Sequence, residues 1–232
     1  AWLQPAIVPL FIVYQLMVPM MIAWFMVSRS AMKAGSIVVA YIVEMITGPA
    51  LYAVLPACGP VYVFRERWLN PPRVEASVIR MSGMPNAFPS LHLATAVVFV
   101  LFAPKALSRA VAIAFLAATG LATIATGEHY LIDLVAGAAF GCFAAAVGHR
   151  RVVPSMLLGG LALTWSLVLR FGSPFLLQHP ILLQVMVVAT LALALAHIAR
   201  EWRRMSTDAH PQDPVTAETQ TIEERVSAVS GV

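Results

Sequence analysis

Residues 129–148 read HYLIDLVAGAAFGCFAAAVG, and this stretch decides the class of fold. After Asp133 no Asp, Glu, Lys or Arg appears until Arg150, and a helix of about 20 apolar residues crosses the hydrocarbon core of a bilayer. The whole chain of 232 residues is 60% hydrophobic and 11% charged, whereas a typical soluble domain is roughly 25% charged. The composition therefore excludes a soluble domain and a wholly disordered chain, and it predicts a membrane protein with several spans.

The gaps between charged residues define seven candidate spans along the chain. They run over 5–27, 34–55, 89–103, 110–126, 129–148, 152–169 and 174–199. The predicted fold class is therefore all-α, a polytopic membrane helix bundle with about six to seven transmembrane helices. Beyond Arg204 the composition becomes polar, acidic and free of aromatic residues, so we predict a membrane domain over 1–204 and a disordered cytoplasmic tail over 205–232.

Basic residues predict how the helices are oriented, because short loops rich in Lys and Arg face the cytoplasm. Nine such residues gather at one set of predicted helix ends: Arg29, Lys33, Lys105, Arg109, Arg150, Arg151, Arg200, Arg203 and Arg204. The segment 56–88 and the corner 127–130 then face the periplasm or cell exterior, and we expect an integral protein of a bacterial inner (plasma) membrane. These anchors are nine of the 15 Lys and Arg residues behind the net charge of +4, so membrane topology explains the basic excess and we expect no nucleic-acid partner.

The external segment 56–88 carries arginines against this bias. They are Arg65, Arg67, Arg73 and Arg80. An excess of arginine on the translocated side calls for another explanation, and an anionic ligand supplies one.

Three ionisable residues within the predicted spans converge on one place. His92 and His129 are 37 residues apart, which is one helix, a short turn and one helix back, so both lie at the same membrane face. Asp133 follows His129 by four residues and shares its helix face. Because burying a charged side chain inside a membrane costs free energy, this cluster of three ionisable residues predicts a functional site.

This set of side chains suits phosphoryl transfer. An imidazole can attack phosphorus and form a phospho-histidine intermediate, and a carboxylate one turn away can hold its other ring nitrogen. A second histidine can protonate the leaving oxygen, and the helix N-termini near Ser90 and both histidines offer N–H groups to phosphate. A metal site stays open as an alternative, since two histidines and one carboxylate can bind iron or zinc.

Two segments of the chain resemble a known family. Residues 86–92, NAFPSLH, and 127–137, GEHYLIDLVAG, are similar to the two best motifs of the type 2 phosphatidic acid phosphatase superfamily. More narrowly, Pro-Ser-Leu-His and His-Tyr-x-x-Asp resemble the aureobasidin-resistance, or inositol phosphorylceramide synthase-like, branch, as does the region 47–62. The similarity covers about residues 40 to 145. It implies a six-helix core with its site at one membrane face, and it implies neither a metal nor another cofactor. One expected helix before the motif region is missing, so we also expect that truncation or processing has shortened the chain at its start.

The resemblance also implies roles for individual residues. His129 would be the nucleophile, Asp133 its orienting partner and His92 the general acid. Ser90 and Tyr130 would help to bind the substrate phosphate. The superfamily's Lys-x6-Arg-Pro motif has no counterpart, and Ala122 and Thr123 stand where the superfamily has Ser-Arg. The phosphate-binding cations are therefore expected among the arginines of the external segment, with Arg80 first because it is nearest His92: Arg80, Arg73, Arg67 and Arg65.

The sequence thus predicts a metal-independent lipid phosphatase or phosphotransferase, inositolphosphotransferase-like, acting on a membrane lipid phosphate or phosphodiester at the extracytoplasmic face. Water as acceptor would make it a phosphatase, and a lipid or sugar hydroxyl would make it a transferase. Two alternatives stay open: a non-catalytic anion or lipid-phosphate transporter or binding protein, and a metal-dependent membrane enzyme. The sequence makes no prediction of oligomeric state.

Overall fold

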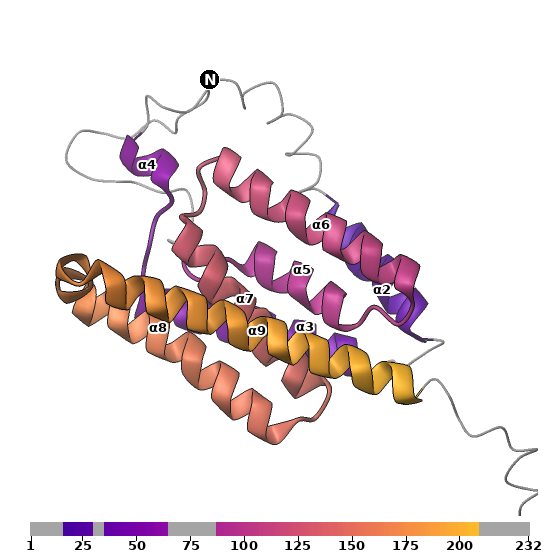
Figure 1. Cartoon of the computed structure of the whole chain (residues 1–232). Helices are drawn as coiled ribbons and strands as arrows, with labels where there is room; N and C mark the ends of the chain where they lie inside the picture. The colour runs from indigo at the N-terminus through magenta and orange to yellow at the C-terminus, as the bar shows by residue number, and fades with distance from the viewer. Residues whose placement is uncertain (1–15, 30–34, 65–86, 209–232) are drawn as a thin grey trace, which may run out of the picture. The chain divides into compact units, whose positions relative to one another are not determined.

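The computed structural model describes residues 16–29, 35–64 and 87–208, and within these ranges all regular elements are helices. In chain order they are α2 (Met17–Arg29), α3 (Gly35–Val54), α4 (Pro60–Phe64), α5 (Leu91–Leu101), α6 (Ala106–Ala125), α7 (Leu131–Gly148), α8 (Val152–Gln178) and α9 (Pro180–Asp208) (Figure 1). The predicted all-α membrane bundle is confirmed.

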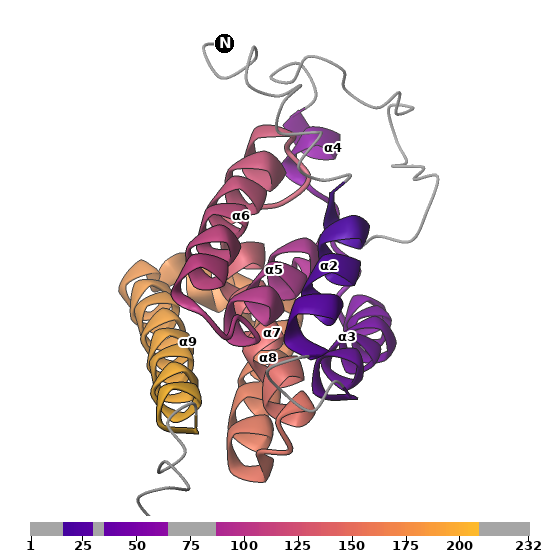
Figure 2. The same cartoon turned by 90° about the vertical axis from the view of Figure 1, so that its right-hand side faces the viewer.

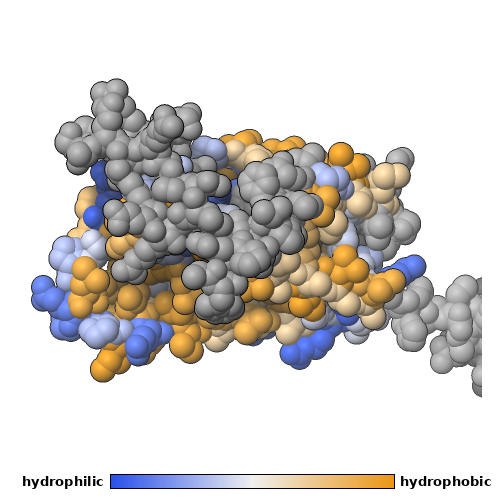
Figure 3. Space-filling model, turned by 90° about the horizontal axis from the view of Figure 1, so that it is seen from above, coloured by the Kyte–Doolittle hydropathy of each residue, from blue (hydrophilic) through white to orange (hydrophobic). Residues whose placement is uncertain are grey.

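Five of the described helices are long and apolar enough to cross a membrane: α3, α6, α7, α8 and α9. The helix α5 is apolar too, but it has only 11 residues. Hydrophobic side chains cover most of the described surface visible in Figure 3, and large ones such as Leu107, Phe171 and Leu177 are exposed. Since a soluble monomer rarely exposes extensive apolar patches, this surface fits contact with lipid, and the chain is an integral membrane protein.

The helix α7 lies at the centre of the described bundle. Its apolar segment is 72% buried, against 17–28% for the other four long helices, and it packs on α3, α5 and α8 (Figure 2). Gly137 and Gly141, one turn apart, permit the close approach of α5. A β-carbon on Gly137 would lie 2.6 Å from the carbonyl oxygen of Ser90, and one on Gly141 would lie 2.5 Å from that of Ala94. Small residues at helix contacts are typical of membrane bundles.

Buried polar contacts link further pairs of helices. The Trp24 indole of α2 donates to the carbonyl oxygen of Phe99 in α5 at 2.7 Å. The Thr95 hydroxyl of α5 donates to the Glu44 carboxyl group of α3 at 2.6 Å. Such contacts fix the rotation of one helix against another, because a polar group left without a partner in this environment is costly.

The boundary between the last two helices differs from the prediction, which placed a break at 170–173. The helix α8 instead continues through Pro174 to Gln178. A proline inside a helix removes one N–H bond, whereas the residue before a proline disfavours the helical conformation itself. The break falls at His179, which precedes Pro180 and has φ −123° and ψ 64°, whereas Ser173, which precedes Pro174, stays helical.

The helix α9 extends to Asp208, four residues beyond the predicted membrane domain. The rest of the predicted tail, 209–232, lies outside the described residues.

One end of the bundle collects the chain turns around residues 87–92 and 127–137. The helices α3 and α6 end there, and α4, α5 and α7 begin there; in Figure 1 this end lies on the left. The basic pairs Lys105/Arg109 and Arg150/Arg151 lie at the turns of the opposite end, between α5 and α6 and between α7 and α8. These basic residues therefore lie together at one end of the bundle, as the prediction of the orientation assumed.

Candidate active site

A tight corner between α6 and α7 presents His129. Gly127 adopts a positive φ of 73°, a conformation that glycine reaches without steric cost. The carbonyl oxygen of Thr123 then accepts hydrogen bonds from the N–H groups of both Glu128 (3.1 Å) and His129 (3.3 Å). The end of α6 therefore fixes where the His129 backbone lies.

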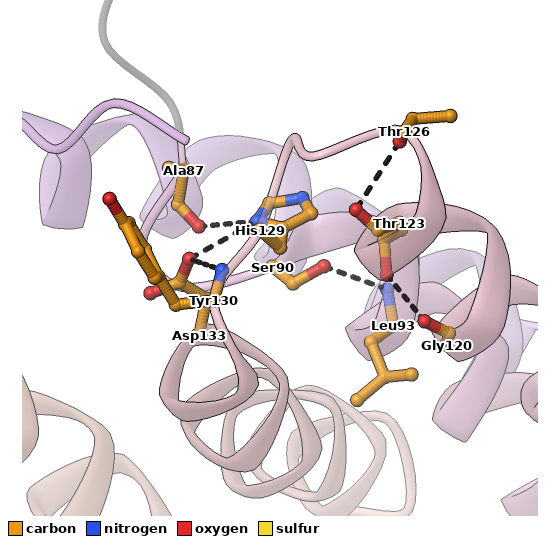
Figure 4. A network of polar contacts seen from close by, with 9 residues as sticks. All are labelled: Ala87, Ser90, Leu93, Gly120, Thr123, Thr126, His129, Tyr130 and Asp133. Atoms are coloured by element: carbon orange, nitrogen blue, oxygen red, sulfur yellow. Dashed lines mark hydrogen bonds and ion pairs between the residues drawn. The ribbon is translucent and has the colours of Figure 1, made fainter. Parts of the chain in front are cut away.

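A backbone carbonyl orients the His129 ring. Nδ1 lies 2.6 Å from the carbonyl oxygen of Ala87, and the side chain is buried (Figure 4). Because a carbonyl oxygen can only accept, Nδ1 must carry the proton, which leaves the lone pair on Nε2. The sequence did not indicate this partner, since every residue has a carbonyl and only the fold selects this one.

Asp133 lies on the same side of the ring. Its Oδ2 atom is 3.6 Å from His129 Nδ1 and accepts the N–H of Tyr130 at 2.7 Å, where α7 begins (Figure 4). The structure thus brings together the histidine and the carboxylate singled out in the sequence. The shorter contact to Nδ1 nevertheless comes from Ala87, and Asp133 adds its charge at a longer distance.

His92, the second residue of α5, faces His129. The ring centroids are 6.3 Å apart at an interplanar angle of 63°. Ser90 caps this helix: its side chain accepts the N–H of Leu93 at 3.4 Å, and its own N–H donates to the carbonyl oxygen of Asp133 at 3.1 Å. Through Ser90, the start of α5 is joined directly to the start of α7.

A polar pocket of about 180 Å³ opens beside the two histidines. Its lining residues are Tyr52, Gly59, Tyr62, His92, Glu128 and His129. Sequence reasoning missed Tyr52, Tyr62 and Glu128 as site residues. The signals in the sequence were weak: Glu128 is adjacent to His129, and Tyr52 and Tyr62 lie in the region 47–62 that resembles the family branch.

The segment after α3 closes one wall of this pocket. The N–H of Val61 donates to the carbonyl oxygen of Gly127 at 2.8 Å. A β-carbon on Gly59 would overlap the carbonyl group of Glu128, so the two backbones touch directly. Ala57 accepts the N–H of Ala87 at 3.0 Å, which ties the same segment to the carbonyl that holds His129.

His92, Glu128 and His129 could also hold a metal ion. One ligand atom from each lies within 4.8 Å of the other two, and two histidines with one carboxylate form a common zinc-binding set. The metal alternative drawn from the sequence used Asp133 as its carboxylate. The structure offers Glu128 in that place, because Asp133 lies behind the ring, on the Nδ1 side.

The other predicted phosphate-binding residues have different outcomes. Ser90 is fully buried, and neither it nor Tyr130 is among the residues that line the polar pocket in the described part of the chain. Although Tyr130 is exposed, partial desolvation, followed by the neighbouring Cys58 and Asp133, raises the pKa of its hydroxyl. The four predicted arginines lie outside the described residues: Arg65, Arg67, Arg73 and Arg80.

Ala122 and Thr123, which replace the Ser-Arg pair of the wider superfamily, are both buried. The Thr123 hydroxyl donates back to the carbonyl oxygen of Gly120 at 3.0 Å, and its backbone holds the His129 corner (Figure 4). This position contributes to the geometry of the site and supplies no cation to it.

A family model for the PAP2 superfamily matches residues 3–147, more than half of the chain. The chain belongs to the PAP2 superfamily. The match includes both segments on which the resemblance was based, 86–92 and 127–137, and it includes His92, His129 and Asp133. No curated protein and no solved structure matches the chain.

Proposed function

We propose that this PAP2 protein is a metal-independent lipid phosphatase or phosphotransferase that works through a phospho-histidine at His129. The observation that carries the proposal is the pair of facing rings, with Nδ1 of His129 held by the Ala87 carbonyl. That arrangement leaves Nε2 of a buried imidazole as a nucleophile, with a second imidazole within reach of the leaving group.

In the first half-reaction, Nε2 of His129 attacks the phosphorus atom. A P–N bond forms and the P–O bond to the leaving group breaks, so that its electron pair moves to the leaving oxygen. His92 donates a proton to that oxygen. The positive charge on the phosphorylated imidazole is stabilised by the Ala87 carbonyl at 2.6 Å and by the Asp133 carboxylate at 3.6 Å.

In the second half-reaction, an acceptor hydroxyl attacks the same phosphorus atom. A new P–O bond forms, the P–N bond breaks and its electron pair returns to Nε2. His92, neutral after the first step, takes the proton of the attacking oxygen. Water as acceptor releases phosphate, whereas a lipid or sugar hydroxyl gives a new phosphodiester.

The substrate in this proposal is a membrane lipid phosphate or phosphodiester whose chains stay in the bilayer while its head group enters the polar pocket. The motifs favour the aureobasidin-resistance, or inositol phosphorylceramide synthase-like, branch. The positive-inside pattern favours a site on the extracytoplasmic face. Arg80, Arg73, Arg67 and Arg65, with Tyr130, remain the proposed phosphate-binding residues, and Ser90 supports them from the start of α5.

The experiment that tests this function uses purified full-length protein and a panel of radiolabelled lipid phosphates, with and without acceptor alcohols. We expect free phosphate or a phosphodiester from the wild type. We expect a loss of turnover of at least about 10³-fold in His129→Gln, a substitution that keeps a side-chain amide in place of the ring. Vanadate, which mimics pentacoordinate phosphorus, should inhibit, and a chelator should have no effect.

The same experiment separates the alternatives. Tight phosphate binding without product, weakened by His129→Gln, would indicate a transporter or binding protein. Loss of activity with chelator would indicate a metal held by His92, Glu128 and His129. Turnover that is equal in wild type and His129→Gln would remove His129 from the reaction altogether.

A further inference from the structure

The polar pocket contains a carboxylate that phosphate binding does not explain. Glu128 lines the pocket together with both histidines. A phosphate group is negative, so a carboxylate beside it repels the substrate and weakens its binding. The phospho-histidine chemistry described above also proceeds without it, since His129 and His92 supply the nucleophile and the proton transfer. We therefore expect Glu128 to have a function whose benefit outweighs its repulsion of the phosphate.

The geometry places the Glu128 carboxylate beside the position of the acceptor hydroxyl. One oxygen of its carboxylate and one ring nitrogen of each histidine lie within 4.8 Å of one another. An acceptor oxygen between the Glu128 carboxylate and the His92 ring can lie about 2.8 Å from both, which is hydrogen-bond distance. Phosphorus bonded to Nε2 of His129 fills the space in front of that nitrogen, so the acceptor oxygen stands beyond the phosphorus atom, in line with the P–N bond that breaks.

The backbone holds Glu128 firmly in this position. Its N–H donates to Thr123 at 3.1 Å, and Gly59 packs against its carbonyl group. The neighbouring Gly127 carbonyl accepts from Val61 at 2.8 Å. A residue fixed at its backbone from both α6 and the segment after α3 can position a small molecule.

We propose that Glu128 binds the acceptor in the second half-reaction and selects one that has two O–H donors. This inference rests on the proposed phospho-His129 mechanism. The attacking oxygen gives its own proton to His92 as the O–P bond forms and the P–N bond breaks. The second O–H, which is the other hydrogen of a water molecule or an adjacent hydroxyl of a polyol, donates to the Glu128 carboxylate. A simple alcohol has only one O–H and leaves the carboxylate without that hydrogen bond.

The first test follows the phosphoenzyme in Glu128→Gln by rapid alkaline quench with a radiolabelled lipid phosphate. We expect it to form at a rate close to that of the wild type and to break down about tenfold more slowly or worse, because only the second half-reaction uses Glu128. Glu201→Gln is the matched control, since Glu201 binds Arg204 at 2.7 Å and does not line the pocket. Its kinetics should equal those of the wild type.

The second test measures acceptor choice as a ratio, which does not depend on the amount of folded protein. With glycerol and 1-propanol at equal concentration, the wild type should form mainly the glycerol product. Glu128→Gln should lower the glycerol-to-propanol product ratio by about tenfold, because a strong hydrogen bond to a charged carboxylate is replaced by a weaker one to a neutral amide oxygen. Removing the negative charge should also make inorganic phosphate a tighter inhibitor.

The outcomes separate the two levels of the proposal. If the wild type forms a phosphoenzyme but Glu128→Gln breaks it down at the same rate with the same product ratio, the role of Glu128 is wrong and the mechanism stands. Equal slowing of formation and breakdown also contradicts the role of Glu128. If the wild type turns over without any phosphoenzyme, the mechanism fails and the inference fails with it.

Discussion

The His129 ring is held by two acceptors of different kinds. The Ala87 carbonyl is neutral and close, at 2.6 Å, and the Asp133 carboxylate is charged and more distant, at 3.6 Å. The carbonyl sets the tautomer and the direction of the ring, and the carboxylate contributes mainly electrostatic stabilisation of the imidazolium. Orientation and charge stabilisation are therefore divided between two groups at this site.

This division predicts a partial effect for Asp133→Asn. An asparagine can still accept the N–H of Tyr130 through its side-chain oxygen, so the start of α7 should remain intact. We expect kcat to fall by about 10–100-fold, as for the loss of a supporting group, because the Ala87 carbonyl still holds the ring. Steady-state kinetics of the wild type, Asp133→Asn and His129→Gln, measured side by side, give the three kcat values. A loss as large as that of His129→Gln would show that Asp133, rather than Ala87, sets the geometry.

At the residue scale, the sequence predicted the parts of the site that are made of reactive side chains. His92, His129 and Asp133 stand out because charged and titratable groups are rare in this chain, and the structure brings all three together. The Ala87 carbonyl could not be predicted, since it comes from the backbone. Tyr52, in the last turn of α3, and Tyr62, in α4, were not predicted as pocket residues, since they reach the pocket only through the packing of parts of the chain that are distant in sequence.

At the element scale, the contact between α5 and α7 sets the distance between the two histidines. Gly137 removes the side chain that would push Ser90 away, and Ser90 starts the helix that carries His92. The approach of the two helices and the geometry of the site are therefore coupled.

We expect Gly137→Ala to destabilise the fold and to reduce activity, because its β-carbon would lie 2.6 Å from the Ser90 carbonyl oxygen. Overpacking of this kind costs about 1–3 kcal/mol. Gly160→Ala is the control: it lies in α8 with nothing within 4 Å of the added β-carbon, and alanine favours helix over glycine by about 1 kcal/mol. Thermal unfolding in detergent should separate the two variants, and equal melting temperatures would refute the coupling.

A second glycine tests the corner itself. Gly59→Ala places a β-carbon against the Glu128 carbonyl group, so the corner must shift while the helices need not. We expect kcat to fall at least about tenfold, since small displacements of catalytic groups are costly, with little change in melting temperature. Parallel measurements of activity and melting temperature decide this. Full activity would mean that the corner tolerates the added carbon.

Helix boundaries show what periodicity and charge gaps can and cannot locate. The predicted spans 34–55 and 129–148 agree with α3 and α7 to within two residues at each end, because charges and turn residues mark both limits. The end of α8 was misplaced, because Pro174 and Arg170 suggested a break that the helix does not make. A proline's effect depends on whether the residue before it can remain helical, which the local sequence alone does not reveal.

At the scale of the whole molecule, the bundle has a basic end and an end that carries His92 and His129, the histidine end. Arg150 and Arg151 connect α7 to α8 at one end, and the His129 corner connects α6 to α7 at the other. The predicted orientation puts the basic end in the cytoplasm and the histidine end outside.

Cysteine labelling tests this orientation. In a background with Cys58→Ala and Cys142→Ala, we expect Tyr130→Cys to react with a membrane-impermeant maleimide in intact bacterial cells expressing the chain. Arg151→Cys should react only after the cells are opened. Tyr130 and Arg151 are both exposed, so access rather than burial decides the result. The reverse pattern would place the histidine end in the cytoplasm.

The central claim is that His129 carries the phosphoryl group during turnover. The most direct measurement is an alkaline rapid quench of the full-length protein with a lipid substrate radiolabelled in its phosphate, followed by identification of the labelled residue. We predict an acid-labile, alkali-stable label on His129 that appears before product and is absent in His129→Gln. If the wild type forms product and no labelled histidine appears before that product, the claim is contradicted.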